Sequence, residues 1–114
     1  MSGRRRTFKV GERIQEVVAR ELLRLSDPRF HLVTIITVVV SSDLRHAKVF
    51  WVVSGGADRI AEVKEAFEAA GGALRARVGR ELKLRVVPQL AFHYDNTLDV
   101  QSHVESLIAR IAKP

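Results

Sequence analysis

Residues Ala69–Thr97 read AAGGALRARVGRELKLRVVPQLAFHYDNT, and this segment carries the strongest structural signals in the chain. Apolar residues recur every three or four positions before the pair Gly71-Gly72, as on the buried face of a helix, and the same rhythm resumes after it. Glycine in a helix interior costs about 1 kcal/mol relative to alanine, so two in succession favour a bend or a close backbone approach. The segment therefore predicts two helices that meet at a kink, the second ending near Leu82.

The charge changes sign across the predicted kink. Residues Asp58–Ala70 contain two basic and four acidic side chains, a net of −2, whereas Gly72–Val87 contain five basic side chains and one acidic side chain, a net of +4. A surface rich in Lys and Arg favours a polyanionic partner, because each neutralised phosphate releases condensed counterions. The second helix therefore indicates nucleic-acid binding, with an ordinary solvated helix face as the alternative.

The composition of the whole chain agrees with a small basic domain. The 114 residues suffice for one core, and 19 Lys plus Arg against 13 Asp plus Glu give a net charge of +6, which favours nucleic acid over an anionic membrane. No apolar run approaches the roughly 20 residues that span a bilayer, and no segment of secretory type follows the N-terminal arginines. The absence of cysteine excludes disulfides and fits a cytoplasmic protein.

The remaining pattern predicts an α+β fold. An amphipathic helix covers about Val10–Leu25, and strands follow at Val33–Ser41 and Ala47–Val53, with Trp51 and Phe50 interpreted as core residues. A third strand begins near Gln89, because Pro88 cannot donate to a strand ladder. A short helix over Val100–Ile111 completes the order α-β-β-α-α-β-α, with helices on one sheet face. We expect residues 1–8 to form a flexible basic arm and residues 9–113 to form the single domain.

The sequence offers little for catalysis or metal binding. The four histidines are isolated from one another, and the aspartates occupy positions where caps and turns place them. Gly71, Gly72 and Gly79 match neither common phosphate-loop pattern. We therefore expect no enzyme activity, no metal and no cofactor. A small RNA hydrolase and a protein-interaction module that uses the first helix are the rival interpretations.

Five blocks of residues form an ordered pattern along the chain. The blocks are Arg13-Ile14; Asp27-Pro28-Arg29; Val33-Thr34 through Val38 and Ser41 to Asp43-Leu44 and Ala47-Lys48-Val49; Ala70-Gly71-Gly72 with Leu74-Arg75; and Leu84, Arg85, Val87, Pro88, Leu90, Phe92, Asp95 and Asn96. In this order and with these gaps, they resemble the bacterial ribosome-binding factor A family from about Lys9 to Ile111. The resemblance implies a KH-like domain of type II in which the interhelical kink Ala70-Gly71-Gly72 replaces the usual G-x-x-G loop.

The resemblance also implies a function. Family members are expected to bind the free or immature 30S small ribosomal subunit and its 16S rRNA, and to promote late maturation, including processing of the rRNA 5′ end near its 5′-terminal helix. They matter most in the cold, and a small-subunit GTPase assists their release. A cytoplasmic monomer without membrane association is expected, and the alternative is a KH-like module for another structured RNA.

Candidate rRNA-binding residues follow by the same analogy, since KH domains hold a single-stranded backbone between the loop and a strand edge, with flanking Lys and Arg. The first candidates for phosphate contacts are Arg75, Arg77, Arg80 and Lys83. The further candidates are Arg85, Arg45 and Lys48, together with Arg4, Arg5 and Arg6 of the basic arm.

Overall fold

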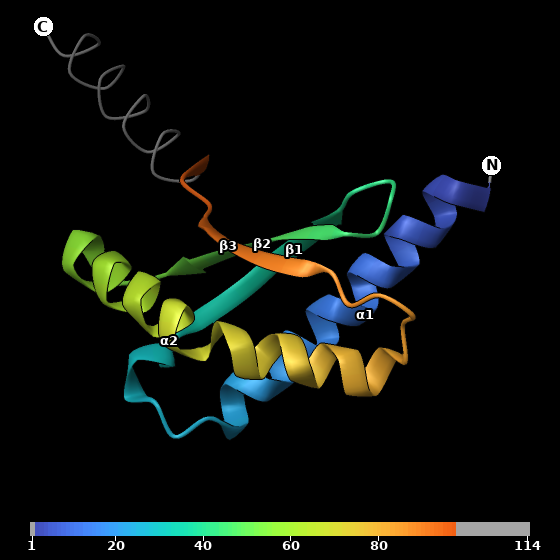
Figure 1. Cartoon of the computed structure of the whole chain (residues 1–114). Helices are drawn as coiled ribbons and strands as arrows, with labels where there is room; N and C mark the ends of the chain where they lie inside the picture. Colours follow the sequence, from blue (N-terminus) through green and yellow to red (C-terminus); the bar gives the residue numbers. More distant parts are fainter. Residues whose placement is uncertain (1, 98–114) are drawn as a thin grey trace, which may run out of the picture.

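The computed structural model describes residues 2–97, which form a mixed α+β domain and confirm the predicted class (Figure 1). Pro88 precedes the third strand, as predicted, and the first two strands lie close to their predicted bounds. The closing helix predicted over Val100–Ile111 lies outside the described residues. The elements are α1 (Ser2–Arg24), the 3-10 helix η1 (Pro28–Phe30), β1 (Val33–Val40), β2 (His46–Val53), α2 (Gly56–Leu82) and β3 (Gln89–Tyr94).

The three strands form one sheet in the order β1-β2-β3. The β1 and β2 strands pair antiparallel, and β2 and β3 pair parallel, so the chain needs a long crossover between β2 and β3, which α2 supplies. Figure 1 shows both helices on the same side of the sheet, with α1 against β1 and α2 passing beneath β3. The described part of the chain therefore has two layers and leaves the second face of the sheet without a helix.

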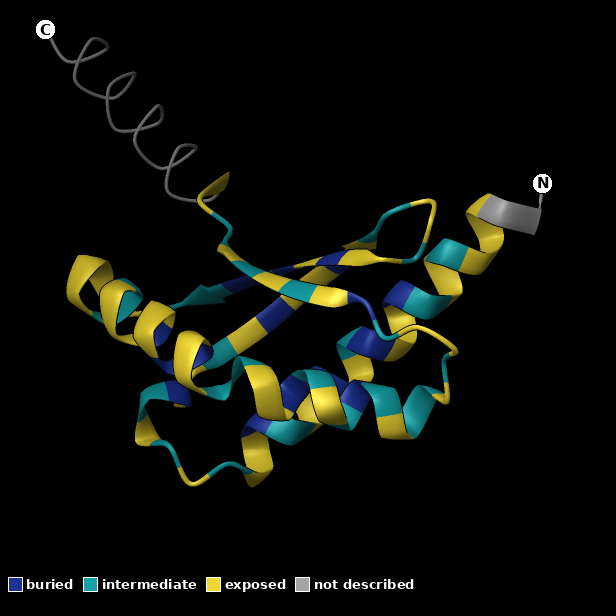
Figure 2. Ribbon diagram, in the orientation of Figure 1, coloured by how far each residue is buried: buried dark blue, intermediate teal, exposed yellow. Residues whose placement is uncertain are grey.

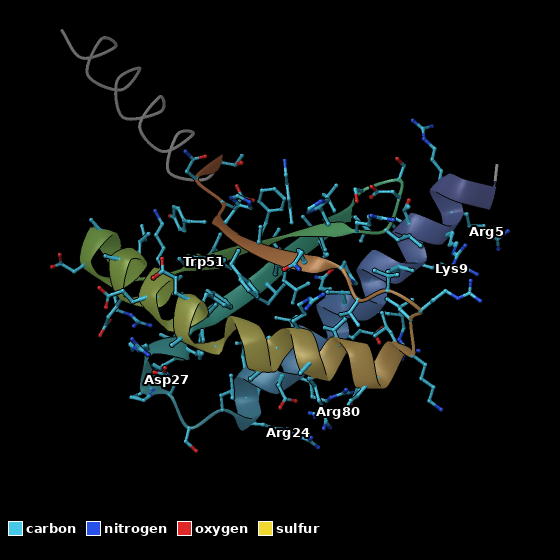
Figure 3. The ribbon with its side chains drawn as sticks, in the orientation of Figure 1. Arg5, Lys9, Arg24, Asp27, Trp51 and Arg80 are labelled. Atoms are coloured by element: carbon cyan, nitrogen blue, oxygen red, sulfur yellow. The ribbon has the colours of Figure 1, made fainter. Side chains whose placement is uncertain are left out.

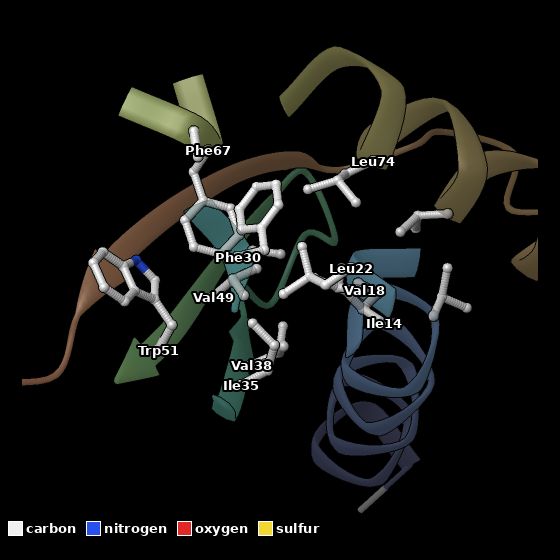
Figure 4. Close-up of a cluster of buried hydrophobic side chains, with 14 of the residues drawn as sticks. Ile14, Val18, Leu22, Phe30, Ile35, Val38, Val49, Trp51, Phe67 and Leu74 are labelled. Carbon is white, nitrogen blue, oxygen red and sulfur yellow. The ribbon is translucent and has the colours of Figure 1, made fainter. Parts of the chain in front are cut away.

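The core lies between the helices and the sheet (Figures 2 and 4). Alternate side chains of β2, Ala47, Val49 and Trp51, are at most 1% exposed. Phe67 of α2 lies at the centre of a ring cluster: it stacks on Phe92 at 4.5 Å between centroids and also contacts Phe30 and Trp51. The aromatic cluster joins α2, η1, β2 and β3 into one core.

The prediction of two separate helices around the glycine pair is wrong. One helix, α2, runs from Gly56 to Leu82 through Gly71-Gly72, and Figure 1 shows it changing direction near its middle. Buried positions keep the three-to-four spacing across the pair, from Phe67 to Leu74 and Val78, so core packing supports helical geometry on both sides. Tertiary burial therefore outweighs the low helix propensity of the two glycines, and the bend remains.

The flexible arm predicted for residues 1–8 is also not what the structure shows. The α1 helix begins at Ser2, so residues 2–8 are helical. Arginine is a good helix former, no proline interrupts the segment, and the Thr7 hydroxyl donates to the Arg4 carbonyl at 2.9 Å. Arg4, Arg5 and Phe8 also line a groove against β1, so the first turns of α1 lie alongside the sheet.

Candidate nucleic-acid interface

Three cations are exposed at the C-terminal end of α2 and just beyond it. Lys83 ends the helix in the left-handed conformation, with a φ of 53°, and its N–H donates to the Gly79 carbonyl at 3.2 Å. This sharp ending places Lys83 and Arg85 just beyond the helix, one turn after Arg80, and all three are exposed. Among residues 2–97, no carboxylate lies within ion-pair distance of any of them.

The neighbouring helix α1 adds two more cations to this end of the molecule. Lys9 and Arg13 are exposed and line a small pocket of 220 Å³ together with Leu82 and Leu84. Figure 3 shows Lys9 on the N-terminal half of α1 and Arg80 projecting from α2. We call Lys9, Arg13, Arg80, Lys83 and Arg85 the basic surface. Sequence reasoning did not select Lys9 and Arg13: Arg13 occupies the polar face of the predicted first helix, whereas Lys9 precedes the predicted start of that helix at Val10.

Two of the predicted phosphate contacts are engaged inside the protein. The Arg75 guanidinium donates to the carbonyls of Val87 and Pro88, at 2.9 and 3.1 Å, and so fastens the loop before β3 to α2. Arg77 lies between the carboxylates of Glu21 and Glu81, at 3.5 and 3.2 Å. RNA contact by Arg75 and Arg77 stays a prediction, and it would compete with these contacts.

A groove runs between α2 and the outer edge of β3. It has a volume of 660 Å³, and Gly71, Lys64 and the ring of Phe92 are among its lining residues. A methyl group at Gly71 would lie 3.8 Å from the Phe92 ring, and one at Gly72 would meet nothing within 4 Å. Gly71 of the kink motif Ala70-Gly71-Gly72 therefore leaves a bare helix surface in the groove, and Gly72 is exposed next to it.

The outer edge of β3 offers backbone groups to the same groove. The Gln89 N–H donates to the Arg45 carbonyl and the Asp95 N–H to the Trp51 carbonyl, each at 2.8 Å. Residues alternate along a strand, so the odd-numbered residues of β3 bond to β2, and the peptide groups of Leu90 and Phe92 point to the outer edge. No strand among residues 2–97 covers that edge.

The other predicted basic residues lie elsewhere. Lys48 projects from β2 on the face that the helices leave open, and Arg45 lies in the turn before β2; both are exposed. Arg4, Arg5 and Arg6 are exposed on the first turns of α1. The structure therefore divides the ten candidates among the end of α2, the open side of the sheet and the start of α1.

The comparisons with known proteins settle the family. The sequence model described as ribosome-binding factor A matches residues 6–108. The chain belongs to the ribosome-binding factor A family. Ribosome-binding factor A of Pseudomonas syringae pv. tomato is 44% identical over 108 residues, which cover 92% of this chain and 78% of the relative.

Solved structures of ribosome-binding factor A agree with the fold. The crystal structure of the Thermus thermophilus protein superposes with a TM-score of 0.68 at 24% identity, covering 77% of this chain and 94% of that chain. A homology model of the Thermus thermophilus factor, fitted into the cryo-EM map of a 30S complex, gives a TM-score of 0.61 at 25% identity. That match covers 73% of this chain and 88% of the fitted chain.

In this ribosome-binding factor A chain, the motif Asp27-Pro28-Arg29 has a structural role. The Asp27 carboxylate accepts from the Arg29 N–H at 3.0 Å and binds the Arg29 side chain through Nε and Nη2. These hydrogen bonds hold the pKa of Asp27 below its usual value. Asp43 accepts from the Ser41 hydroxyl and the Arg45 N–H, and Asp95 accepts from Thr97, so both aspartates stabilise local turns, and these hydrogen bonds lower their pKa values.

Two further observations concern other kinds of site. Within residues 2–97, no three His, Asp or Glu side chains gather closely enough to hold a metal ion. None of the described helices has the length and apolar character needed to cross a bilayer.

Proposed function

We propose that this protein binds the small ribosomal subunit through its 16S rRNA, using the basic surface at the C-terminal end of α2. The observation that carries this proposal is the group of exposed cations Arg80, Lys83 and Arg85, which have no carboxylate partner in the described chain. Membership of a family in which a homology model of the Thermus member was fitted into the map of a 30S complex supports the small subunit as the source of the polyanion. Arginine and lysine side chains that form no ion pair within the protein are available to neutralise phosphates.

The groove beside Gly71-Gly72 extends this contact. In KH domains, a single-stranded backbone lies between a glycine-containing loop and a strand edge. Here the bare helix surface and the free edge of β3 flank the groove, and Lys64 lines it. We propose that the fold works as a KH-like clamp in which the glycines let an RNA backbone approach the helix closely.

The consequence of binding is also a proposal. The protein holds a local arrangement of immature rRNA during late maturation of the 30S subunit, including 5′-end processing, and a small-subunit GTPase assists its release. It acts as a cytoplasmic monomer, without a catalytic step or a cofactor, and its contribution is largest in the cold. Weak, incorrect RNA contacts persist longer at low temperature. A protein that binds the correct rRNA arrangement shifts the equilibrium toward it by mass action.

Co-sedimentation with 30S subunits tests the proposal. The test variant is Lys83→Gln plus Arg85→Gln, which removes two charges from the basic surface. The control is Ala57→Glu plus Ala61→Glu, which changes the net charge equally at two exposed positions on the first half of α2. Arg75 is unsuitable, because its loss would free the loop before β3.

We expect the glutamine variant to bind about tenfold more weakly or worse and the control to bind like the wild type. Equal binding by all three proteins would refute the assigned surface. Binding to rRNA fragments without binding to subunits would favour a KH-like module for another structured RNA.

A further inference from the structure

The face of the sheet opposite the helices presents an ordered set of side chains. The strand register places Val39 of β1, Lys48 of β2 and Ala91 of β3 in one row, and Thr37, Phe50 and His93 in the next. The core residues of β2, Ala47, Val49 and Trp51, alternate with Lys48 and Phe50 and point to the other side. The two rows form what we call the open face.

Phe50 therefore does not belong to the core, contrary to the sequence-based interpretation. It is half-buried, and its ring lies 5.6 Å from the ring of His93, with a tilt of 32° between the planes. His93 is exposed, and Val39 in the adjoining row is 54% exposed. A cross-strand ring pair of this kind stabilises the sheet modestly, and the exposed His93 ring leaves a planar surface accessible to a ligand.

The charge of the open face identifies the class of ligand. The strands β1, β2 and β3 contain no Asp or Glu at all, whereas β2 carries His46 and Lys48 and the turn before it carries Arg45. Asp43 is the acidic residue of that turn, and it is occupied by the Ser41 hydroxyl and the Arg45 N–H, at 2.6 and 3.0 Å. The face thus combines a ring pair with cations, and its three strands carry no carboxylate.

We propose that the open face binds an unpaired RNA nucleotide, with the base stacked on the Phe50–His93 pair and a phosphate held by Lys48. Stacking suits this site because every base has a planar π-face, and an exposed sheet is a common support for such stacking. Lys48 and Phe50 are two residues apart on β2 and therefore lie next to each other on the same face of the sheet. The base and the phosphate of one nucleotide can thus be bound at the same time. The inference rests on the proposed function and adds a second RNA contact on the open face, next to the groove that His93 also lines.

Binding of a short fluorescent oligouridine, followed by anisotropy, tests the site. Phe50→Leu keeps an apolar side chain but removes the ring, whereas Phe50→Tyr keeps an aromatic ring at this position. Val86→Ala is the matched control, because Val86 is 54% exposed and lies outside the sheet. We expect Phe50→Leu to weaken binding about tenfold, Phe50→Tyr to bind like the wild type, and Val86→Ala to have no effect. Thermal unfolding of each variant checks that the fold is retained.

A direct signature comes from NMR spectroscopy of the wild-type protein. Oligouridine should shift the ring-proton resonances of His93, because a stacked base imposes a ring current on them. Unshifted His93 signals at saturation, or Phe50→Leu binding as tightly as the wild type, would overturn the inference. If Lys83→Gln plus Arg85→Gln still lost subunit binding in that case, the proposed function would stand without the stacking site. Loss of subunit binding by Phe50→Leu with intact oligouridine binding would also overturn it and identify a protein partner.

Discussion

Asp27 orders the turn between α1 and β1 through its contacts with Arg29. It caps η1 at the Arg29 N–H and forms a two-pronged ion pair with the Arg29 guanidinium. The carbonyls of Arg29 and His31 in turn accept from Arg59 of α2, at 3.2 and 2.5 Å. The turn between α1 and β1 is therefore fixed to α2, and the Asp27-Pro28-Arg29 motif has a physical reason that does not involve RNA.

Asp27→Asn should lower the melting temperature at neutral pH by a few degrees, because the amide keeps one acceptor but loses the ion pair. The folded protein holds the pKa of Asp27 below 3.8, so it binds fewer protons than the unfolded chain in that range. The stabilisation by ionised Asp27 is thus complete above about pH 5 and is lost as the pH falls through the unfolded and then the folded pKa. Thermal melts of both proteins between pH 7 and pH 2.5 measure the difference, and a constant difference across that range would contradict the assignment.

Gly11 of α1 and Gly72 of α2 differ in whether the fold has room for a larger side chain. A methyl group at Gly11 of α1 would lie 2.8 Å from the Val38 carbonyl oxygen, which belongs to the backbone of β1 and cannot move easily. At Gly72 of α2, a methyl group would meet nothing within 4 Å. Gly11 therefore permits close packing of helix on sheet, whereas the fold does not require Gly72.

Gly11→Ala should destabilise the protein by about 1–2 kcal/mol, because the steric cost exceeds the helix propensity that alanine adds. Gly72→Ala should stabilise it by up to about 1 kcal/mol, while its methyl group obstructs the approach of an RNA backbone and weakens 30S binding. Urea unfolding and co-sedimentation on the same samples separate the two effects. Unchanged subunit binding by Gly72→Ala would remove the glycine pair from the interface.

Arg77 contributes a charged contact between α1 and α2. It faces Glu21 of α1 and Glu81 of α2, and Glu81 is also paired with Arg20. The side chains of Glu21 and Arg77 are only 17% and 28% exposed, so their charges are poorly screened by water. Removal of the cation alone would leave Glu21 without compensation between the helices.

Arg77→Leu should therefore cost about 1–2 kcal/mol, and Arg77→Leu plus Glu21→Leu should recover most of that loss, because an apolar pair needs no compensation. A double-mutant cycle by urea unfolding measures the coupling. Additive losses in the double variant would show that Glu21 and Arg77 act independently.

Strand β3 and helix α2 differ in how far the sequence alone predicts them. Strand β3 was predictable because Pro88 and the alternation of Leu90 and Phe92 are local signals. The continuity of α2 was not, because it depends on core contacts made on both sides of Gly71-Gly72. The contacts of Arg75 were not predictable either, because its acceptors lie 12 and 13 residues away in the chain. The sequence suggested that Arg75 binds RNA, whereas in the structure it binds backbone carbonyls.

The whole molecule separates its charges in space. The first half of α2 is acidic, the C-terminal end of α2 with Lys9 and Arg13 is basic, and the strands have no carboxylates. Net charge and the sign reversal were visible in the sequence. The open face was not, because the periodicity of β2 does not tell which of Phe50 and Trp51 faces the helices until the helices are placed.

This separation predicts a strong salt dependence of 16S rRNA binding. Phosphate contacts release counterions, so the affinity should fall linearly on a logarithmic plot against salt, with a slope set by the number of contacts. Lys83→Gln plus Arg85→Gln should reduce that slope by about two, whereas Phe50→Leu should weaken binding without changing the slope, because stacking releases no counterions. Filter binding between about 50 and 200 mM KCl measures both slopes. A shallow wild-type slope would mean that apolar docking dominates the association, and a slope unchanged by the glutamine substitutions would place the phosphates away from the end of α2.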